Sequence, residues 1–139
     1  MFDRILVTLD VNDPEGSKPV AEAARKLATA HGSDLHALTV VPDPGFALVG
    51  SALSPDHAKD MQAAVTSALS ALVSDVLGEG TTIHTAQGTI YDRILRTASE
   101  VGADCIVIGA HRPELRDYLI GPNAARVARH ASQSVLVVR

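Results

Sequence analysis

Short apolar runs alternate with amphipathic segments along the chain, and this alternation restricts the possible fold more than any other feature. Each run is too short for a buried helix and is rich in valine, isoleucine and leucine, as buried strands are. The segments between the runs repeat their apolar residues every three or four positions, which predicts helices. The predicted strands are Ile5–Leu9, Asp34–Val41, Thr82–Ala86, Cys105–Ile108 and Ser134–Val138. Strands separated by helices favour an α/β fold with one open, mostly parallel sheet and helices on both faces.

The predicted helices begin and end at recognisable signals. The first runs from Pro19 to Ala30 and is closed by His31-Gly32, with Ser17 or Lys18 as its cap, because proline is tolerated in a first helical turn. The others run from the cap Ser54 to about Leu77, from Tyr91 to Val101, and from Asn123 to Ala131. We expect the second helix to bury one apolar stripe, formed by Met61, Val65, Leu69, Leu72 and Val76.

Size and composition indicate an ordinary globular chain. Its 139 residues suit a single domain covering residues 1–139, and 46% of them are hydrophobic. The formal net charge of −4 gives no support to nucleic-acid or membrane-surface binding. The one cysteine, Cys105, rules out an intramolecular disulfide. No signal peptide or 18-residue apolar run is apparent, so we expect a cytoplasmic protein.

The segment after the fourth predicted strand carries the clearest functional signal. The strand stops at Gly109, a loop rich in arginine and histidine follows, and a new helix starts through Gly121-Pro122-Asn123. A glycine-bounded loop that leads into a helix N-terminus offers free backbone N–H groups and the positive end of the helix dipole to an anion. Asp10, Val40–Val41 and Gly88 also fall at carboxyl ends of predicted strands, where ligands bind in open α/β sheets.

Four segments resemble the universal stress protein family over the whole chain. They are ILVTLD, LTVVPDP, AQGTIYDRIL and IVIGAHR…YLIG…ARVARHASQSVLVVR, and the last is most similar to a nucleotide-binding branch whose loop reads His-Arg-Pro. The resemblance implies a Rossmann-like sheet of the adenine nucleotide alpha hydrolase type in strand order 3-2-1-4-5. It also implies ATP or AMP binding, with or without Mg²⁺, in a stress-response regulatory module. It further implies homodimers formed by antiparallel pairing of the last strand, or tetramers built from them.

The resemblance assigns roles to individual residues. Asp10 would contact the adenosine, the backbone of Val40 would meet the adenine beside Val41, and the phosphate loop would run from Ile108–Gly109 to Gly121. The expected nucleotide-binding set is Thr8, Leu9, Asp10, Val40, Val41, Ile108, Gly109, His111, Arg112, Gly121, Pro122, Asn123 and Ala124.

The sequence departs from the family pattern at the phosphate loop. Arg112 stands at the second glycine of the motif, and eight residues rather than nine separate it from Gly121. Pro122 replaces a serine or threonine and offers neither an N–H nor a hydroxyl. Asn123 and Ala124 keep their N–H groups, and Arg112, Arg116 and Arg126 could supply charge to phosphate oxygens.

Alternative interpretations remain open. Asp10 could simply cap a turn, and Gly88 and Gly109 could merely allow tight turns. His36, His57 and His84 are scattered along the chain without metal-ligand spacing, so no dedicated metal site is expected. Besides nucleotide binding, the chain could be a nucleotide-free interaction module of the same family. A third hypothesis, a weak ATPase or self-phosphorylating protein, rests on analogy alone, and no catalytic residue is assigned.

Overall fold

The computed structural model describes residues 1–42, 55–110 and 120–139 and contains one five-stranded sheet. The strand order is β3-β2-β1-β4-β5, and every neighbouring pair is parallel. This confirms the expected open parallel sheet in the order 3-2-1-4-5. The strands are β1 (Arg4–Thr8), β2 (Asp34–Val41), β3 (Thr82–Gln87), β4 (Cys105–Gly109) and β5 (Ser134–Val138).

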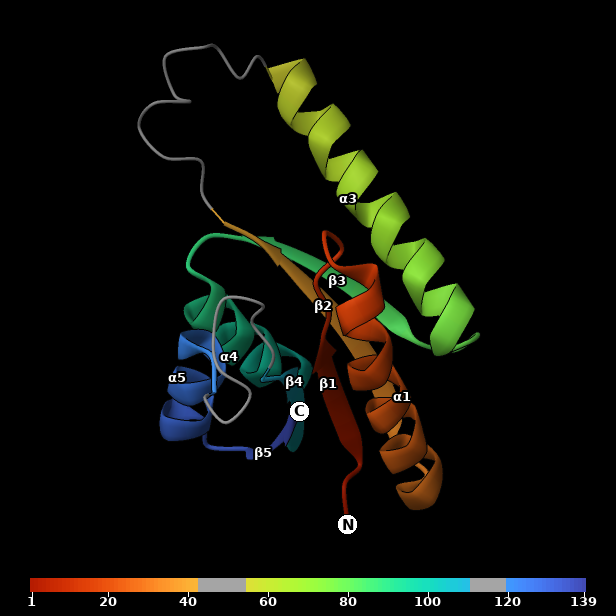
Figure 1. Ribbon diagram of the computed structural model, residues 1–139, viewed down its shortest axis with the longest axis vertical. Helices are drawn as coiled ribbons and strands as arrows, with labels where there is room; N and C mark the ends of the chain where they lie inside the picture. Colours follow the sequence, from red (N-terminus) through yellow and green to blue (C-terminus); the bar gives the residue numbers. More distant parts are fainter. Residues whose placement is uncertain (43–54, 111–119) are drawn as a thin grey trace.

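Helices cover both faces of the sheet (Figure 1). On one face lie α1 (Pro14–His31) and α3 (Pro55–Val76), and on the other lie α4 (Ile90–Val101) and α5 (Pro122–His130). Side chains alternate across each strand, so β1 supplies both cores: Ile5 and Val7 pack toward α1 and α3, whereas Leu6 packs toward α4 and α5. Two apolar layers therefore hold β1 and β4 at the centre of the molecule.

The start of α1 differs from the prediction. The helix begins at Pro14, five residues before the predicted Pro19, and Asp13 caps it by accepting a hydrogen bond from the Gly16 N–H at 3.1 Å. Pro14 occupies the first helical position, where a missing N–H costs nothing, so Pro19 lies inside the helix. Ser17, predicted as a cap, is buried within the helix.

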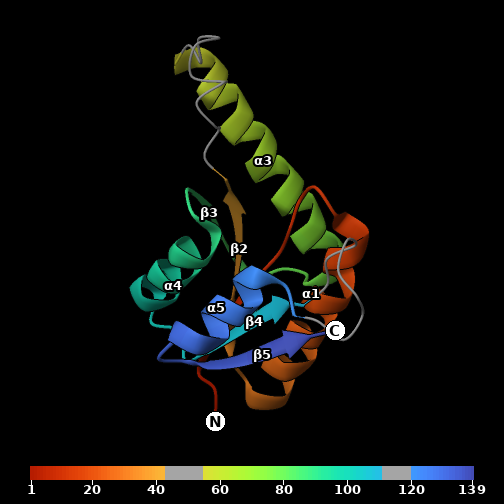
Figure 2. The ribbon, with the colours of Figure 1, turned by 60° about the vertical axis from the view of Figure 1, so that its left-hand side comes forward.

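The predicted stripe on α3 is buried only toward the C-terminal end of the helix. Leu69 and Leu72 lie in the core, but Met61 is 48% exposed because the N-terminal half of α3 extends beyond the sheet (Figures 1 and 2). The predicted cap Ser54 lies outside the described residues. Within those residues, no helix has the length and apolar character needed to cross a bilayer.

Candidate functional site

The sheet reverses its direction of winding between β1 and β4. The chain leaves β1 for α1 on one face, whereas it leaves β4 for α5 on the other face. Because both connections depart from carboxyl ends of adjacent strands, a crevice is expected there, at the point where ligands bind in open α/β sheets. The predicted residues on β1, β2 and β4 and at the start of α5 all belong to this edge of the sheet.

The turn after β1 is held by a backbone hydrogen bond to β2 and by the side chain of Ser17. Thr8 is the last residue of β1, and the N–H of buried Leu9 donates to the carbonyl of Leu38 on β2 at 2.9 Å. The backbone of Asp10 is fixed by Ser17, whose hydroxyl donates to the Asp10 carbonyl at 3.0 Å and accepts from its N–H at 2.9 Å. The role of Ser17 was missed from the sequence, because it depends on α1 starting earlier than predicted.

The Asp10 side chain closes the same turn. Its Oδ1 accepts a hydrogen bond from the N–H of Asn12 at 2.9 Å, and the residue is exposed beyond the carboxyl end of β1. The turn-capping interpretation therefore has a geometric basis. This hydrogen bond uses only one of the two carboxylate oxygens, so capping the turn and contacting a ligand are compatible with one conformation.

The end of β2 presents its backbone in two directions. Val41 pairs toward β3, and its carbonyl accepts from the N–H of Gly88 at 3.0 Å. Alternation along the strand directs the N–H and carbonyl of Val40 the other way, toward β1. The register of β1 with β2 ends at Thr8 and Leu38, so the Val40 backbone lies beyond this ladder. Val40, rather than Val41, thus offers a donor and an acceptor at the crevice.

The two ends of the predicted phosphate loop are joined to each other. Ile108 is buried on the α4–α5 face, and Gly109 ends β4. The N–H of Gly121 donates to the carbonyl of Ala110 at 3.2 Å, and the Ala110 N–H donates to Val138 on β5 at 2.8 Å. The chain therefore returns to the point where it left the sheet. His111 and Arg112 lie outside the described residues.

The first turn of α5 has no side-chain cap. Gly121 occupies the cap position and Pro122 the first helical position. The helical hydrogen bonds begin with the Ala125 N–H donating to the Gly121 carbonyl at 3.0 Å, so the N–H groups of Asn123 and Ala124 precede the helical ladder. These two donors and the positive end of the helix dipole are the features of this helix start that suit an anion.

Arg126 packs against Tyr91 of α4. Its guanidinium carbon lies 5.0 Å from the ring centroid of Tyr91 on α4, a cation–π contact that joins α4 to α5. The suggestion that Arg126 supplies charge to a phosphate stays a prediction, because residues 111–119 lie outside the described part of the chain.

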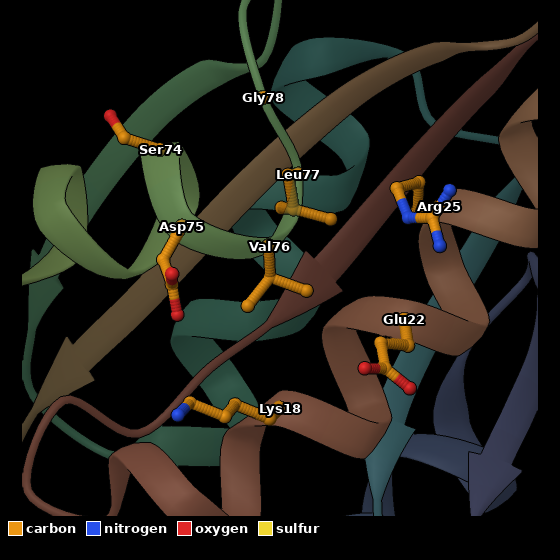
Figure 3. Close-up of a pocket in the computed structure, with 8 residues that line it drawn as sticks. All are labelled: Lys18, Glu22, Arg25, Ser74, Asp75, Val76, Leu77 and Gly78. Carbon is orange, nitrogen blue, oxygen red and sulfur yellow. The ribbon is translucent and has the colours of Figure 1, made fainter.

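A separate surface cavity of about 470 Å³ lies between α1 and the end of α3 (Figure 3). Lys18, Glu22 and Arg25 line it from α1, opposite residues 74–78, and none of the predicted nucleotide-binding residues takes part. Lys18 is paired with Glu15 at 3.0 Å, and this neighbour raises the pKa of the Lys18 ammonium group. Since cations and carboxylates mix along an open cavity wall, no single ligand charge is favoured there.

Two histidines predicted to be scattered lie together. His36 on β2 and His84 on β3 approach to 2.8 Å between Nδ1 and Nε2. The sequence placed each histidine on a predicted strand. It did not give the register between the two strands, which brings the two rings together. The described residues contain no group of three or more histidine, cysteine or acidic side chains suited to a metal. Cys105 is buried, and burial raises the pKa of its thiol, which suits packing rather than redox chemistry.

Comparisons with known proteins agree on one family. The model of the "Universal stress protein family" matches residues 1–139. Two curated relatives, both universal stress protein G, come from Shigella flexneri and Escherichia coli O157:H7; each is 32% identical over 150 residues, covering 100% of both chains.

Solved structures share the fold. A universal stress protein in complex with cAMP is 20% identical, with 99% of this chain and 97% of that chain covered and a TM-score of 0.69. The universal stress protein of Archaeoglobus fulgidus in complex with dAMP is 23% identical, with 99% and 98% covered and a TM-score of 0.62. The chain described above belongs to the universal stress protein family.

Proposed function

We propose that this protein binds an adenine nucleotide, ATP or AMP, in the crevice between the carboxyl ends of β1 and β4, and acts as a regulatory module. One observation carries the proposal: the start of α5, with two N–H groups ahead of the helical ladder, is tied to the end of β4 through the Gly121–Ala110 hydrogen bond. This hydrogen bond supports the proposal because a helix N-terminus at the switch point suits an anionic ligand. The complexes of related proteins with cAMP and dAMP support an adenine ligand.

The remaining contacts follow from the same edge of the sheet. The Val40 backbone offers a donor–acceptor pair for the adenine ring, and the second carboxylate oxygen of Asp10 suits a ribose hydroxyl. Gly109 lets the chain turn out of β4, and Asn123 and Ala124 donate to phosphate oxygens. Nucleotide occupancy would shift the protein toward whichever conformation binds the ligand better, and partners would respond to that conformation.

Pro122 favours a second candidate function, a nucleotide-free interaction module. It stands at the first helical position of α5, where it removes one of the N–H donors that a phosphate would use. Under this alternative, the crevice stays empty at millimolar ATP, and the protein acts through surface contacts alone.

Calorimetric titration separates the two functions. Nucleotide-stripped protein is titrated with Mg-ATP and with AMP, and GTP serves as the control for base recognition. We expect saturable binding of one adenine nucleotide per chain and no matching response to GTP. Absence of heat together with an unchanged melting temperature at millimolar ATP would instead support the nucleotide-free module.

Substitution of Pro122 tests the phosphate contacts directly. Pro122→Ser adds an N–H and a hydroxyl at an exposed position whose backbone is already helical. A new hydrogen bond to a charged group contributes about 1.5–3 kcal/mol, so ATP affinity should rise roughly tenfold or more. Adenosine, which lacks phosphate, should bind both proteins equally. Equal ATP affinity in the two proteins would show that phosphate does not reach the start of α5.

A further inference from the structure

His36 and His84 meet edge to edge on the side of the sheet covered by α4. The nearest ring nitrogens are 2.8 Å apart, the ring centroids are 5.1 Å apart, and the ring planes differ by only 16°. A nitrogen separation this short is a hydrogen-bond distance and is incompatible with rings lying face to face. One nitrogen must therefore carry the proton while the other presents its lone pair.

This geometry limits how many protons the pair can hold. Two neutral imidazoles share one hydrogen bond, and a single positive charge can still be shared across it. If both rings are protonated, two N–H groups point at each other and two like charges meet. The contact between His36 and His84 is thus incompatible with the doubly protonated state.

The charged groups around the pair come from three elements. Arg4 on β1 and Asp34 at the start of β2 act on His36, while Glu100 on α4 acts on His84. The other charged residues of α4 are Asp92, Arg93 and Arg96, of which Arg96 pairs with Asp92 at 3.1 Å.

Most of these influences favour neutral rings. Burial lowers the pKa of His36, and the neighbouring His84 and Arg4 lower it further, whereas Asp34 opposes the shift. Burial also lowers the pKa of His84, and Glu100 opposes that shift. Unfolded or opened chains therefore bind more protons than the closed pair in the acidic range.

The pair joins the edge strand to the rest of the sheet. Among the described residues, β3 has a strand neighbour on one side only, β2, with His84 opposite Leu38 and His36 opposite Thr82 in the register. A side-chain hydrogen bond between the two strands adds to the backbone ladder at a place where the ladder is one-sided. Loss of that hydrogen bond affects β3 before any other strand.

We propose that His36 and His84 form a proton-sensitive clamp that holds edge strand β3 on β2 and releases it when both rings become protonated. The expected sign follows from the protons bound in each state. Since the open state binds more protons, acidification from the ordinary histidine range, about pH 6.5, favours opening. Above that range the clamp is fully closed, and neutral pH protects β3.

A metal ion fits the pair less well than a proton does. Two imidazole nitrogens bound to tetrahedral Zn²⁺ at about 2.0–2.1 Å are about 3.3 Å apart. The rings would therefore have to separate and rotate so that both lone pairs met at the metal. No third metal-ligating side chain completes a site among the described residues.

Amide hydrogen exchange of β3 tests the clamp. Exchange is measured from pH 8 to pH 5 and corrected for the intrinsic rate at each pH, so that only opening remains. The key variant is His36→Asn combined with His84→Gln, because the two amides can keep a hydrogen bond at the Nδ1 and Nε2 positions without titrating. His130→Gln is the control, since His130 is exposed at the end of α5.

In the wild type, opening of β3 should increase by up to about tenfold per pH unit below pH 6.5, the slope for uptake of one proton. The control should follow the wild type, and the double variant should show a flat profile. Identical profiles in the wild type and the double variant would overturn the proposal. Imidazole NMR showing both rings charged while β3 stays protected would overturn it as well. So would a Zn²⁺ titration in which the pair binds one metal ion at neutral pH.

Discussion

At the scale of single residues, Gly109 combines its proposed ligand role with a packing requirement. A Cβ atom at this position would lie 3.0 Å from Cγ2 of Val20 on α1, closer than ordinary van der Waals contact. The glycine lets α1 pack against the end of β4, where the predicted phosphate loop begins. A large residue at position 109 would therefore disturb the fold as well as any bound nucleotide.

We predict that Gly109→Val destabilises the protein by about 1–3 kcal/mol through overpacking, whereas Gly109→Ala costs less. Urea unfolding without nucleotide measures both changes. Val20→Ala should recover part of the loss in the Gly109→Val protein, although Val20→Ala alone is destabilising, because it removes the opposing methyl groups. If Gly109→Val is as stable as the wild type, the close contact with Val20 is not a constraint on this position.

The contact between His36 and His84 shows what single-residue reasoning from sequence misses. Each histidine lies on an amphipathic strand, and neither has the spacing from acids, cysteine or other histidines that is typical of a metal site. Only the register of β2 with β3, which sets His84 opposite Leu38, brings the rings together. Register depends on packing across the whole sheet, so it could not be read from either strand alone.

At the scale of elements, the strand bounds and most helix starts were predicted to within one residue, and the start of α1 is the exception. β2 and β5 have the predicted bounds, because proline or a turn stops each apolar run. The start of α1 was misplaced because Pro19 was taken as a first-turn residue, while Asp13 and Pro14 provide an earlier and better start. Because proline is compatible with several helix positions, the cap residue is the better indicator of where the helix begins.

The two halves of α3 differ in how much of their apolar surface is buried. Leu69 is fully buried against the sheet, whereas Met61, two turns earlier on the same predicted stripe, is 48% exposed. Helical periodicity indicates which face is apolar, but it does not tell how far the sheet extends beneath it. The predicted stripe lies on the correct face of α3, but the buried part of that face is shorter than predicted.

We predict that Leu69→Ala costs about 2–5 kcal/mol of stability, as large-to-small changes in a packed core do. Met61→Ala should change stability by about 0.5 kcal/mol or less, since the N-terminal half of α3 has little to pack against. Thermal or urea unfolding of the matched pair makes the comparison. A large loss in Met61→Ala would mean that this half of α3 is covered in solution, by another part of the chain or by a second molecule.

At the scale of the whole molecule, the strand order was predicted from the family resemblance and not from periodicity. Alternating strands and helices imply a parallel sheet, but many strand orders satisfy that pattern. The order 3-2-1-4-5 came from the resemblance, and the structure confirms it. This order makes β5 an edge strand, with Leu136 40% exposed. An apolar edge is an aggregation hazard unless it is paired, so we propose that β5 pairs antiparallel with the same strand of a second subunit.

The backbone of β5 indicates which residues such pairing would use. The Ser134 N–H donates to Asp104 and the Val138 carbonyl accepts from Ala110, so both residues face β4. Alternation along the strand directs the N–H groups of Val135 and Val137 outward, to the open edge. A proline at position 137 therefore removes an outward donor without removing a hydrogen bond to β4.

We predict that the wild type sediments as a dimer at micromolar concentration and that Val137→Pro shifts it toward monomer while circular dichroism stays unchanged. Val137→Ala is the matched control, because it trims the side chain but keeps the N–H, and it should remain a dimer. Dissociation of both variants would assign the interface to side-chain packing rather than to strand pairing. A dimer that survives Val137→Pro with the same dissociation constant, or a wild type that is monomeric, would show that β5 does not form the interface. The comparison between proline and alanine thus distinguishes the contribution of the Val137 N–H to dimer formation from that of its side chain. The exposed surface of Leu136 alone does not make this distinction.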